Sequence, residues 1–334
     1  HLIHRLHGDD GLAVYRASLQ PWDLLREDVA AVPEDRLRAA AAAALAAAQD
    51  RLVEKERFSR LGIATPEYRA VETRADLAAA VADLGFPAVL KTRRFGYDGK
   101  GQWLLRQHED LELAWREAGE HPLILEQWLR FDHECAITAV RGVDGELRFW
   151  PLSHTVHRSG ILRLAASRPA PDPLTDQARE HLTRLAEDLE YVGCLTLELF
   201  AIDGELLANE FAPRVHNSAH WSIEGAHCSQ FENHLRAVCG WPLGDTAARG
   251  RSLMVNFIGA MPERAAWLAL SGLHWHDYGK SERAGRKVGH ATLCADDEHA
   301  FEQSLRRLAP LLVPEEAQSL TSMASDSAGS NSTR

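Results

Sequence analysis

The chain has 334 residues, and its 37 lysines and arginines against 48 aspartates and glutamates give it a formal net charge of −11. This length suits two or three modest domains, and the acidic balance argues against a general nucleic-acid-binding or anionic-membrane surface. The five cysteines form no C-x-x-C pair, which favours the reducing cytoplasm, and no apolar run approaches the roughly 20 residues that span a bilayer.

The first half of the chain is expected to alternate helices with short strands. A helical run is predicted from residue 33 to residue 60, where alanine, the strongest helix former, is abundant. A strand at residues 86–92 then leads through a glycine-rich loop into a second strand that ends at Leu105. The other elements predicted up to residue 150 are helices at residues 74–84 and 109–118 and strands at residues 123–127, 134–141 and 146–150.

The second half contains a predicted hairpin over an Asp203-Gly204 turn, with strands at residues 194–200 and 205–210. The tail from residue 322 is rich in Ser, Ala and Asn without an apolar period, which predicts disorder. The remaining predicted elements are strands at residues 153–157, 161–165, 254–258, 273–278 and 287–293 and helices at residues 175–189, 231–238, 263–270 and 298–308.

The hairpin carries two carboxylates, Glu198 and Glu210. Each alone is compatible with an ordinary exposed strand position. Their apolar neighbours, however, indicate a half-buried sheet, where unpaired carboxylates are costly. Because Mg²⁺ takes one or two carboxylates together with phosphate oxygens, the pair predicts a site for magnesium and phosphate.

Glu210 also opens a stretch of unusual composition. Residues 210–221 read Glu-Phe-Ala-Pro-Arg-Val-His-Asn-Ser-Ala-His-Trp, with neither a period of two nor one of 3.6. A buried face is therefore a poor explanation, and a cationic loop beside the carboxylates is a better one. His216 and His220 lie four apart, which could indicate zinc, but no third ligand has a matching spacing.

The glycine-rich loop is a candidate phosphate lid. Gly96, Gly99 and Gly101 would let backbone N–H groups approach a phosphate, and Lys91 and Lys100 would supply positive charge. The loop matches neither the Walker A pattern nor the dinucleotide pattern that opens a helix. An ordinary glycine-rich hairpin remains the alternative.

A second cationic cluster lies near the C-terminal strands. Arg283, Arg286 and Lys287 are interleaved with glycines and are followed by His290. The cluster is compatible with a solvated turn and also with an anion clamp.

Together these pieces resemble the ATP-grasp superfamily and, within it, the N5-carboxyaminoimidazole ribonucleotide synthetases of purine biosynthesis, from about residue 50 to about residue 314. The glycine loop and the paired glutamates are shared across the superfamily, whereas residues 213–218 and 285–290 are more specific. The matching pieces are residues 50–55, 90–91, 96–102, 124–127, 151–157 and 160–163, Glu198, and residues 209–221 and 285–290.

The resemblance implies an α+β protein with the ATP-grasp fold, in which two α+β subdomains grip ATP. It also implies a shortened N-terminal Rossmann-like lobe, a small β-rich C-terminal subdomain and a homodimer. The expected division is a lobe remnant with connecting helix (1–50), the small subdomain with the glycine lid (51–122), the large subdomain with the metal and catalytic site (123–245), the C-terminal subdomain (246–318) and a disordered tail (319–334).

The implied reaction joins bicarbonate to 5-aminoimidazole ribonucleotide at the expense of ATP, through carboxyphosphate, with Mg²⁺ on the nucleotide. Glu198 and Glu210 would hold the metal, and Arg214, His216, Asn217 and Lys287 would be catalytic. The nucleotide would lie against Arg51, Lys91, Gly96, Tyr97, Asp98, Gly99, Lys100, Gly101, Gln102, Glu126, Gln127, Trp128, Leu129, Glu134, His157, Asn209 and Glu210. The substrates would lie against Tyr97, Asp98, Arg214, His216, Asn217, Ser218, His220, Arg286 and Lys287.

The chain departs from this family at its N-terminus. The family opens with a lobe of about a hundred residues that begins with a strand and a glycine-rich turn. Here about fifty residues precede Arg51, and such a turn is absent from them. The expectation is an intact nucleotide half with altered ribonucleotide binding. Two alternatives therefore stay open: a catalytically silent paralogue that binds nucleotide or a partner chain, and a different ATP-grasp carboxylate–amine ligase.

Overall fold

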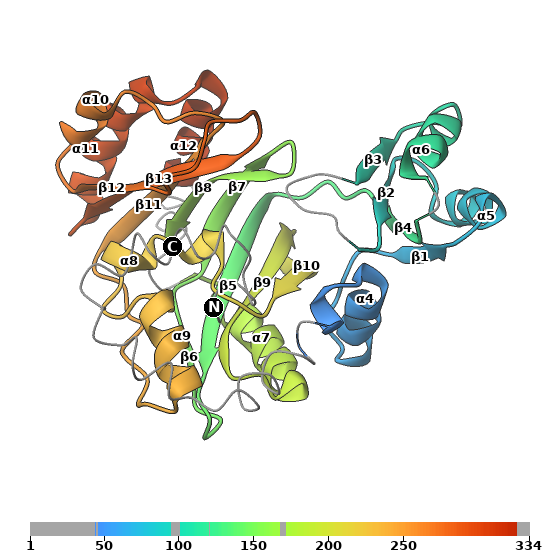
Figure 1. Ribbon diagram of the computed structural model, residues 1–334, viewed down its shortest axis with the longest axis horizontal. Helices are drawn as coiled ribbons and strands as arrows, with labels where there is room; N and C mark the ends of the chain where they lie inside the picture. The colour runs from blue at the N-terminus through green and yellow to red at the C-terminus, as the bar shows by residue number, and fades with distance from the viewer. Residues whose placement is uncertain (1–43, 45, 95–100, 120, 168–171, 326–334) are drawn as a thin grey trace, which may run out of the picture.

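The computed structural model describes residues 44, 46–94, 101–119, 121–167 and 172–325 (Figure 1). Two antiparallel sheets form its framework, and the smaller has the strand order β1-β4-β2-β3. Helices α5 and α6 pack on this sheet through a cluster that includes Leu77, Leu90 and Leu125. The elements of this unit are β1 (Tyr68–Val71), α5 (Arg74–Leu84), β2 (Ala88–Thr92), β3 (Gln102–Leu105), α6 (Asp110–Ala118) and β4 (Leu123–Gln127).

The larger sheet has the order β10-β9-β5-β7-β8-β11-β13-β12, with β6 paired to β5. All of its pairs are antiparallel, so short hairpins can join many of the neighbouring strands. Its strands are β5 (His133–Arg141), β6 (Leu147–Phe149), β7 (Ser153–Arg158), β8 (Ile161–Ser167), β9 (Gly193–Ile202), β10 (Glu205–Ala212), β11 (Arg251–Ile258), β12 (Leu273–Asp277) and β13 (Lys287–Ala295).

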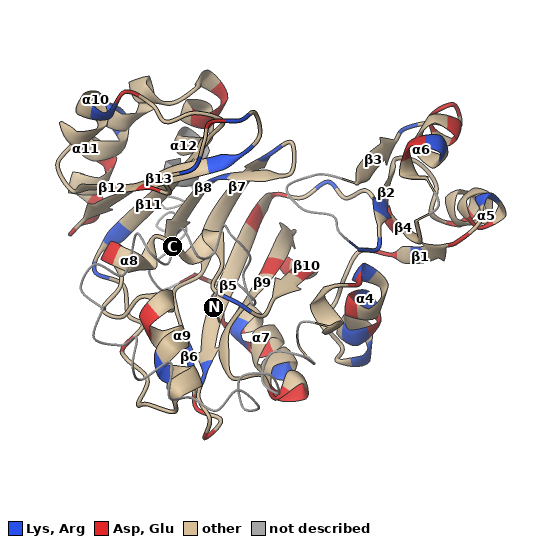
Figure 2. Cartoon of the chain, viewed as in Figure 1, with Lys and Arg blue, Asp and Glu red and all other residues tan. Residues whose placement is uncertain are grey.

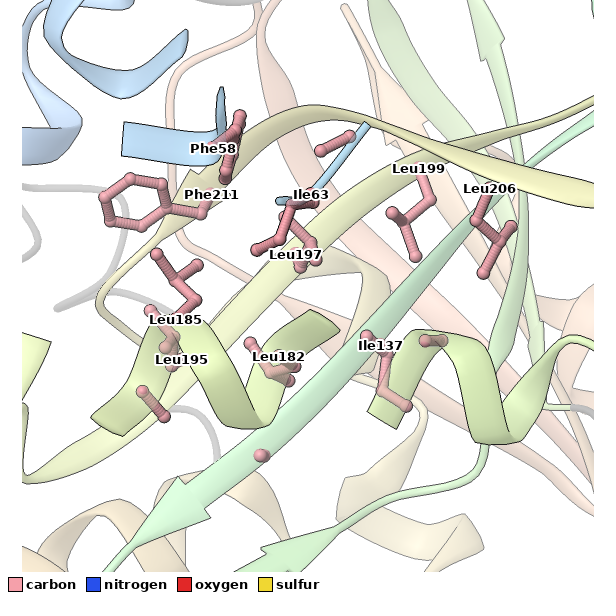
Figure 3. Close-up of a cluster of buried hydrophobic side chains, with 14 of the residues drawn as sticks. Phe58, Ile63, Ile137, Leu182, Leu185, Leu195, Leu197, Leu199, Leu206 and Phe211 are labelled. Carbon is pink, nitrogen blue, oxygen red and sulfur yellow. The ribbon is translucent and has the colours of Figure 1, made fainter. Parts of the chain in front are cut away.

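Helices cover the larger sheet in separate groups. Helix α7 buries Leu182 and Leu185 against Ile137, Leu197 and their neighbours on the strands (Figure 3). A second cluster lies between β11–β13 and the last helices, which Figure 1 shows stacked over that end of the sheet. Outside the unit of the small sheet, the described helices are α4 (Arg51–Arg60), α7 (Thr175–Leu189), α8 (Ser222–Gly225), α9 (Gln230–Cys239), α10 (Arg264–Leu268), α11 (Glu298–Leu308) and α12 (Pro314–Ser325), with short 3₁₀ turns at Asn217–Ala219 and Ala309–Leu311.

A β-bulge at Asn209 sets the side-chain directions of β10. Ala208 faces Leu199 on β9, yet the next paired residue of β10 is Glu210, which faces Glu198. The extra residue reverses the in–out alternation of the strand. Leu206, Ala208 and Phe211 therefore all reach the core, while Glu210 lies on the half-buried face.

Most predicted elements are confirmed, including both strands of the hairpin, but the long helix is not continuous. Asp50 is extended and its carboxylate accepts the N–H of Leu52, so a new helix begins at Arg51. The side chain of Asp50 stabilises this start in the manner of an N-cap. The earlier part of the predicted helix, residues 33–43, lies outside the described residues.

The predicted subdomain division needs correction in two places, at β4 and at the start of the tail. Strand β4 belongs to the small sheet, because it pairs with β1 and β2, so the boundary after residue 122 comes too early. Strand β11 pairs with β8, so the predicted C-terminal subdomain (246–318) continues the larger sheet, and its boundary stays a prediction. Helix α12 runs to Ser325, so the first part of the predicted disordered tail is helical. In the part of the chain that is described, no helix is both long and apolar enough to cross a membrane.

Candidate active site

The two predicted metal ligands lie directly opposite each other on paired strands, Glu198 on β9 and Glu210 on β10. Cross-strand partners project from the same face of a sheet and have neighbouring Cβ atoms. Figure 2 shows acidic positions of β5, β9 and β10 gathered close to one another. The bulge at Asn209 produces this pairing, because without it Asn209 would face Glu198.

Glu198 is held by two imidazoles. His216 Nε2 lies 3.0 Å from one carboxylate oxygen and His157 Nε2 lies 3.8 Å from the other. Burial alone would raise the pKa of Glu198, but His216, His157 and Lys287 lower it to about 2. The carboxylate is therefore ionised and ready to act as an oxygen ligand.

The two histidines play different parts. The Nδ1 of His216 accepts the backbone N–H of Ser218 at 3.3 Å, so its proton sits on Nε2 and points to Glu198. His157 places Nδ1 3.0 Å from Glu134 on β5. Burial acts to lower the pKa of His157, yet Glu134 and Glu198 raise it above its ordinary value. The two carboxylates thus favour the charged form of His157 between them.

Glu210 is the more open member of the pair, with 41% of its side chain exposed, and Arg51 Nη1 lies 3.0 Å from its Oε2. A hard divalent cation needs one or two carboxylates plus phosphate oxygens, which these two glutamates can supply. The donor set thus fits Mg²⁺. Among the described residues, no group of three or more His, Cys, Asp or Glu is arranged to hold a metal by itself.

A buried ion cluster connects the predicted nucleotide residues of the small sheet. Lys91 Nζ on β2 donates to Glu126 Oε2 on β4 at 2.8 Å. Burial would raise the pKa of Glu126, but Lys55 and Lys91 lower it to about 2. The second oxygen of Glu126, Oε1, is buried without a hydrogen-bond partner, which leaves an acceptor available for a ligand donor.

The glycine lid is described only at its end. Gly101 has φ +66°, and a Cβ there would lie 2.6 Å from Thr92 Oγ1 on β2, so the position requires glycine. Gln102 begins β3. The predicted lid residues Gly96, Tyr97, Asp98, Gly99 and Lys100 lie outside the described residues.

The loop after β10 folds over a buried glutamine, Gln230 at the start of α9. Its Oε1 accepts the backbone N–H of His216, and its Nε2 donates to the backbone carbonyl of His216 and to His220 Nδ1, each at 2.8 Å. Asn217 is held by Asn256 on β11. Sequence reasoning did not single out Gln230 or Asn256.

The remaining predicted residues divide between the site and its rim. Lys287, the first residue of β13, acts electrostatically on Glu198, His157 and His216. Arg286 lies beside it with Nη1 3.0 Å from Ser281 Oγ. After Gln127, the last residue of β4, Trp128 and Leu129 follow in the connection to the larger sheet, where Trp128 is 43% exposed.

Comparison with known proteins agrees with this geometry. The family model of the ATP-grasp domain matches residues 56–231, and that of the phosphoribosylaminoimidazole carboxylase C-terminal domain matches residues 252–304. N5-carboxyaminoimidazole ribonucleotide synthase from Pseudomonas aeruginosa is 55% identical over 256 residues, which cover 76% of this chain and 71% of that protein.

Solved structures give the same result. The crystal structure of N5-carboxyaminoimidazole ribonucleotide synthetase from Thermus thermophilus has a TM-score of 0.75 and 49% identity, covering 80% of this chain and 74% of that one. The Aspergillus clavatus synthase, in complex with ADP and 5-aminoimidazole ribonucleotide, has a TM-score of 0.73 and 28% identity, covering 82% of this chain and 74% of that one. The chain therefore belongs to the N5-carboxyaminoimidazole ribonucleotide synthase family of the ATP-grasp superfamily.

Proposed function

We propose that this chain is an ATP-dependent ligase that carboxylates 5-aminoimidazole ribonucleotide to its N5-carboxyamino form in purine biosynthesis. The observation that carries the proposal is the Glu198–Glu210 pair, placed opposite each other by a bulge, in a chain 55% identical to a synthase of that name. Relatives solved with ADP, and with ADP and the ribonucleotide together, support the substrates.

Glu198 and Glu210 would hold Mg²⁺, which neutralises charge on the transferred phosphoryl group. Lys91, Arg51 and the lid at residues 96–102 would hold the phosphates. Residues 126–129 would form the adenine hinge. Glu134 would accept hydrogen bonds from the ribose hydroxyls, and His157 and Asn209 would line the ATP pocket. Phosphoryl transfer depends on such positioning and charge neutralisation more than on covalent chemistry by the protein.

Bicarbonate would attack the γ-phosphate to form carboxyphosphate and ADP, and the substrate amine would then take the carboxyl group and release phosphate. Arg214, His216, Asn217, Ser218 and His220 would hold the bicarbonate and the intermediate. Tyr97 and Asp98 of the lid would close on the substrate, and Arg286 and Lys287 would bind its phosphate. Lid closure would exclude water, which would otherwise hydrolyse the intermediate.

The test is ADP release with and without 5-aminoimidazole ribonucleotide and bicarbonate. The ligase requires both for full turnover. Nucleotide binding without turnover would identify a silent paralogue, and turnover with a different carboxylate and amine would identify another ATP-grasp ligase.

The metal assignment has its own test. Glu210→Gln is expected to lower the turnover rate by at least about 100-fold while the melting temperature stays near that of the wild type, because a metal ligand is lost at a half-exposed position. Glu205→Gln, on an exposed position of the same strand, is the matched control and should keep the wild-type rate. An unchanged rate in Glu210→Gln would remove the metal assignment.

We also propose a cytoplasmic homodimer. Five free cysteines support the reducing compartment. The dimer rests on resemblance to the family, and sedimentation equilibrium of the full chain tests it.

A further inference from the structure

Helix α4 contacts the bulge of β10 through three polar side chains, those of Arg51, Glu54 and Lys55. Arg51 reaches the Glu210 carboxylate, Glu54 Oε1 accepts the N–H of Phe211 at 2.6 Å, and Lys55 Nζ donates to the carbonyl of Asn209 at 2.9 Å. Residues spaced by three and four lie on one face of a helix. One face of α4 therefore meets three successive residues of the strand that carries Glu210.

Lys55 also contacts β4 of the smaller sheet. Its ammonium donates to Thr65 Oγ1 at 2.9 Å and to the carbonyl of Ala208 at 3.4 Å, and it lies 3.5 Å from Glu126 Oε2 on β4. Only 1% of its side chain is exposed. Burying an ammonium costs several kcal/mol unless partners compensate for the lost water. Apart from Thr65, which lies between α4 and β1, these partners come from β10 of the larger sheet and β4 of the smaller one.

The bulge needs this support because it takes Asn209 out of the hydrogen-bond ladder. The carbonyl of Ala208 also accepts the Thr65 hydroxyl at 2.8 Å, so the loss of the cation falls mainly on the carbonyl of Asn209. A slip of one residue would restore the ladder and relieve that loss. Such a slip would place Asn209 opposite Glu198 and turn Glu210 to the other face of the sheet. The carboxylate pair would then be lost, although neither glutamate had changed.

We infer that Lys55, assisted by Glu54, is a positioning residue of the nucleotide site, which fixes the Asn209 bulge, and with it Glu210, to the strand that carries Glu126. This inference rests on the proposed function, because it gives Glu210 a metal to bind. In this role Lys55 acts on Glu210 through the bulge, since its partners are Thr65, Glu126 and the carbonyls of Ala208 and Asn209. It couples the metal-binding half to the nucleotide-binding half.

The test compares the affinity for β,γ-imido-ATP with and without Mg²⁺, measured by titration calorimetry on the full chain. The ratio of the two affinities reports the metal site and is insensitive to a loss of folded protein. Lys55→Met, which keeps the length of the side chain and removes the charge, is expected to lower the ratio by about 10- to 100-fold. The control, Arg60→Met, removes an exposed cation of the same helix and should keep the wild-type ratio.

The wild type and Glu210→Gln separate this inference from the proposed function. If the wild type shows no enhancement by Mg²⁺, the metal assignment itself fails. If the wild type shows enhancement and Glu210→Gln loses it, the metal assignment holds. A wild-type ratio in Lys55→Met would then overturn the positioning role, and a lowered ratio would support it.

Three variants at two other positions keep the question answerable if Lys55→Met does not fold. Thr65→Val removes the hydroxyl that joins Lys55 to the carbonyl of Ala208, with little change of shape, and should lower the ratio in the same direction. Glu54→Gln keeps an oxygen that can accept the Phe211 N–H and should retain the ratio, whereas Glu54→Leu should lower it. Equal ratios in all three variants and in the wild type would overturn the inference.

Discussion

Gln230 is a buried residue whose amide orientation is determined by the backbone. A backbone N–H can only donate and a carbonyl can only accept, so the contacts with His216 fix which end of the amide is the oxygen. The second hydrogen of Gln230 Nε2 is donated to His220 Nδ1. The His220 proton therefore sits on Nε2, where it can donate to a ligand.

This arrangement predicts the effect of Gln230→Glu. A carboxylate cannot donate to His220 Nδ1 and instead attracts a proton there. Burial lowers the pKa of His220 in the wild type, and the added carboxylate should raise it. Imidazole ¹⁵N spectra should show Nδ1 unprotonated in the wild type and protonated in the variant near neutral pH. The other charged and titratable groups around His220 are Arg214, His216, His276, Lys287 and His290.

The matched control is Gln303→Glu, which adds the same charge at an exposed position of α11. Its spectrum at His220 should match that of the wild type. A protonated Nδ1 in the wild type would contradict the assigned tautomer.

Residue types alone revealed part of the site. Glu198 and Glu210 stood out because unpaired carboxylates with apolar neighbours are costly on a half-buried strand. Glu54 and Lys55 did not, since charged residues on a helix ordinarily lie in solvent. Only the fold shows that both are buried, with exposed fractions of 2% and 0%. The bulge at Asn209 was equally hidden, because nothing in the local sequence marks an extra residue in the strand.

At the scale of elements, helix α7 stabilises the fold through one buried face that packs on the larger sheet. Leu182 is fully buried among residues of β5, β9 and β10 (Figure 3). Leu182→Ala is expected to lower the free energy of unfolding by about 2–5 kcal/mol, because it removes buried methyl groups and leaves a cavity. Urea denaturation followed by circular dichroism measures this change.

Leu268→Ala provides the comparison, since Leu268 of α10 is 51% exposed. A surface substitution of this kind usually changes the free energy of unfolding by less than about 0.5 kcal/mol. Equal losses in the two variants would show that the cluster around Leu182 does not stabilise the fold as described.

The sequence period predicted the amphipathic helices well, and α5, α7 and α11 have their predicted bounds. Among the described α-helices and strands, three escaped prediction: β1 (Tyr68–Val71) and α8 are short, and α12 extends into a polar, serine-rich segment. Short elements give too few residues to establish a period. The assignment of β4 to the small sheet depends on strand pairing, which is a non-local property that no local pattern reports.

At the scale of the whole molecule, each sheet carries one carboxylate of the candidate site whose pKa is lowered. Glu126 lies on β4 of the small sheet and Glu198 on β9 of the larger one. Cationic neighbours offset the cost of burying each and lower both pKa values to about 2, from an ordinary value of 4.5. Acid should therefore weaken both halves over the same range of pH.

The sign follows from which state binds the proton first. Because both pKa values are lower in the folded state, the unfolded chain takes up protons at higher pH. Their stabilisation is thus present above about pH 4.5 and is lost as the pH falls toward 2, by on the order of 3 kcal/mol for Glu126. Glu126→Gln is expected to be less stable at neutral pH, because Lys55 and Lys91 lose their buried counter-ion, and to show a shallower loss of stability in acid. Urea unfolding at a series of pH values measures both effects, with Glu205→Gln as the exposed control. Parallel curves for Glu126→Gln and the wild type would mean that Glu126 titrates alike in the folded and unfolded chains, and the buried ion cluster would then not hold the carboxylate ionised.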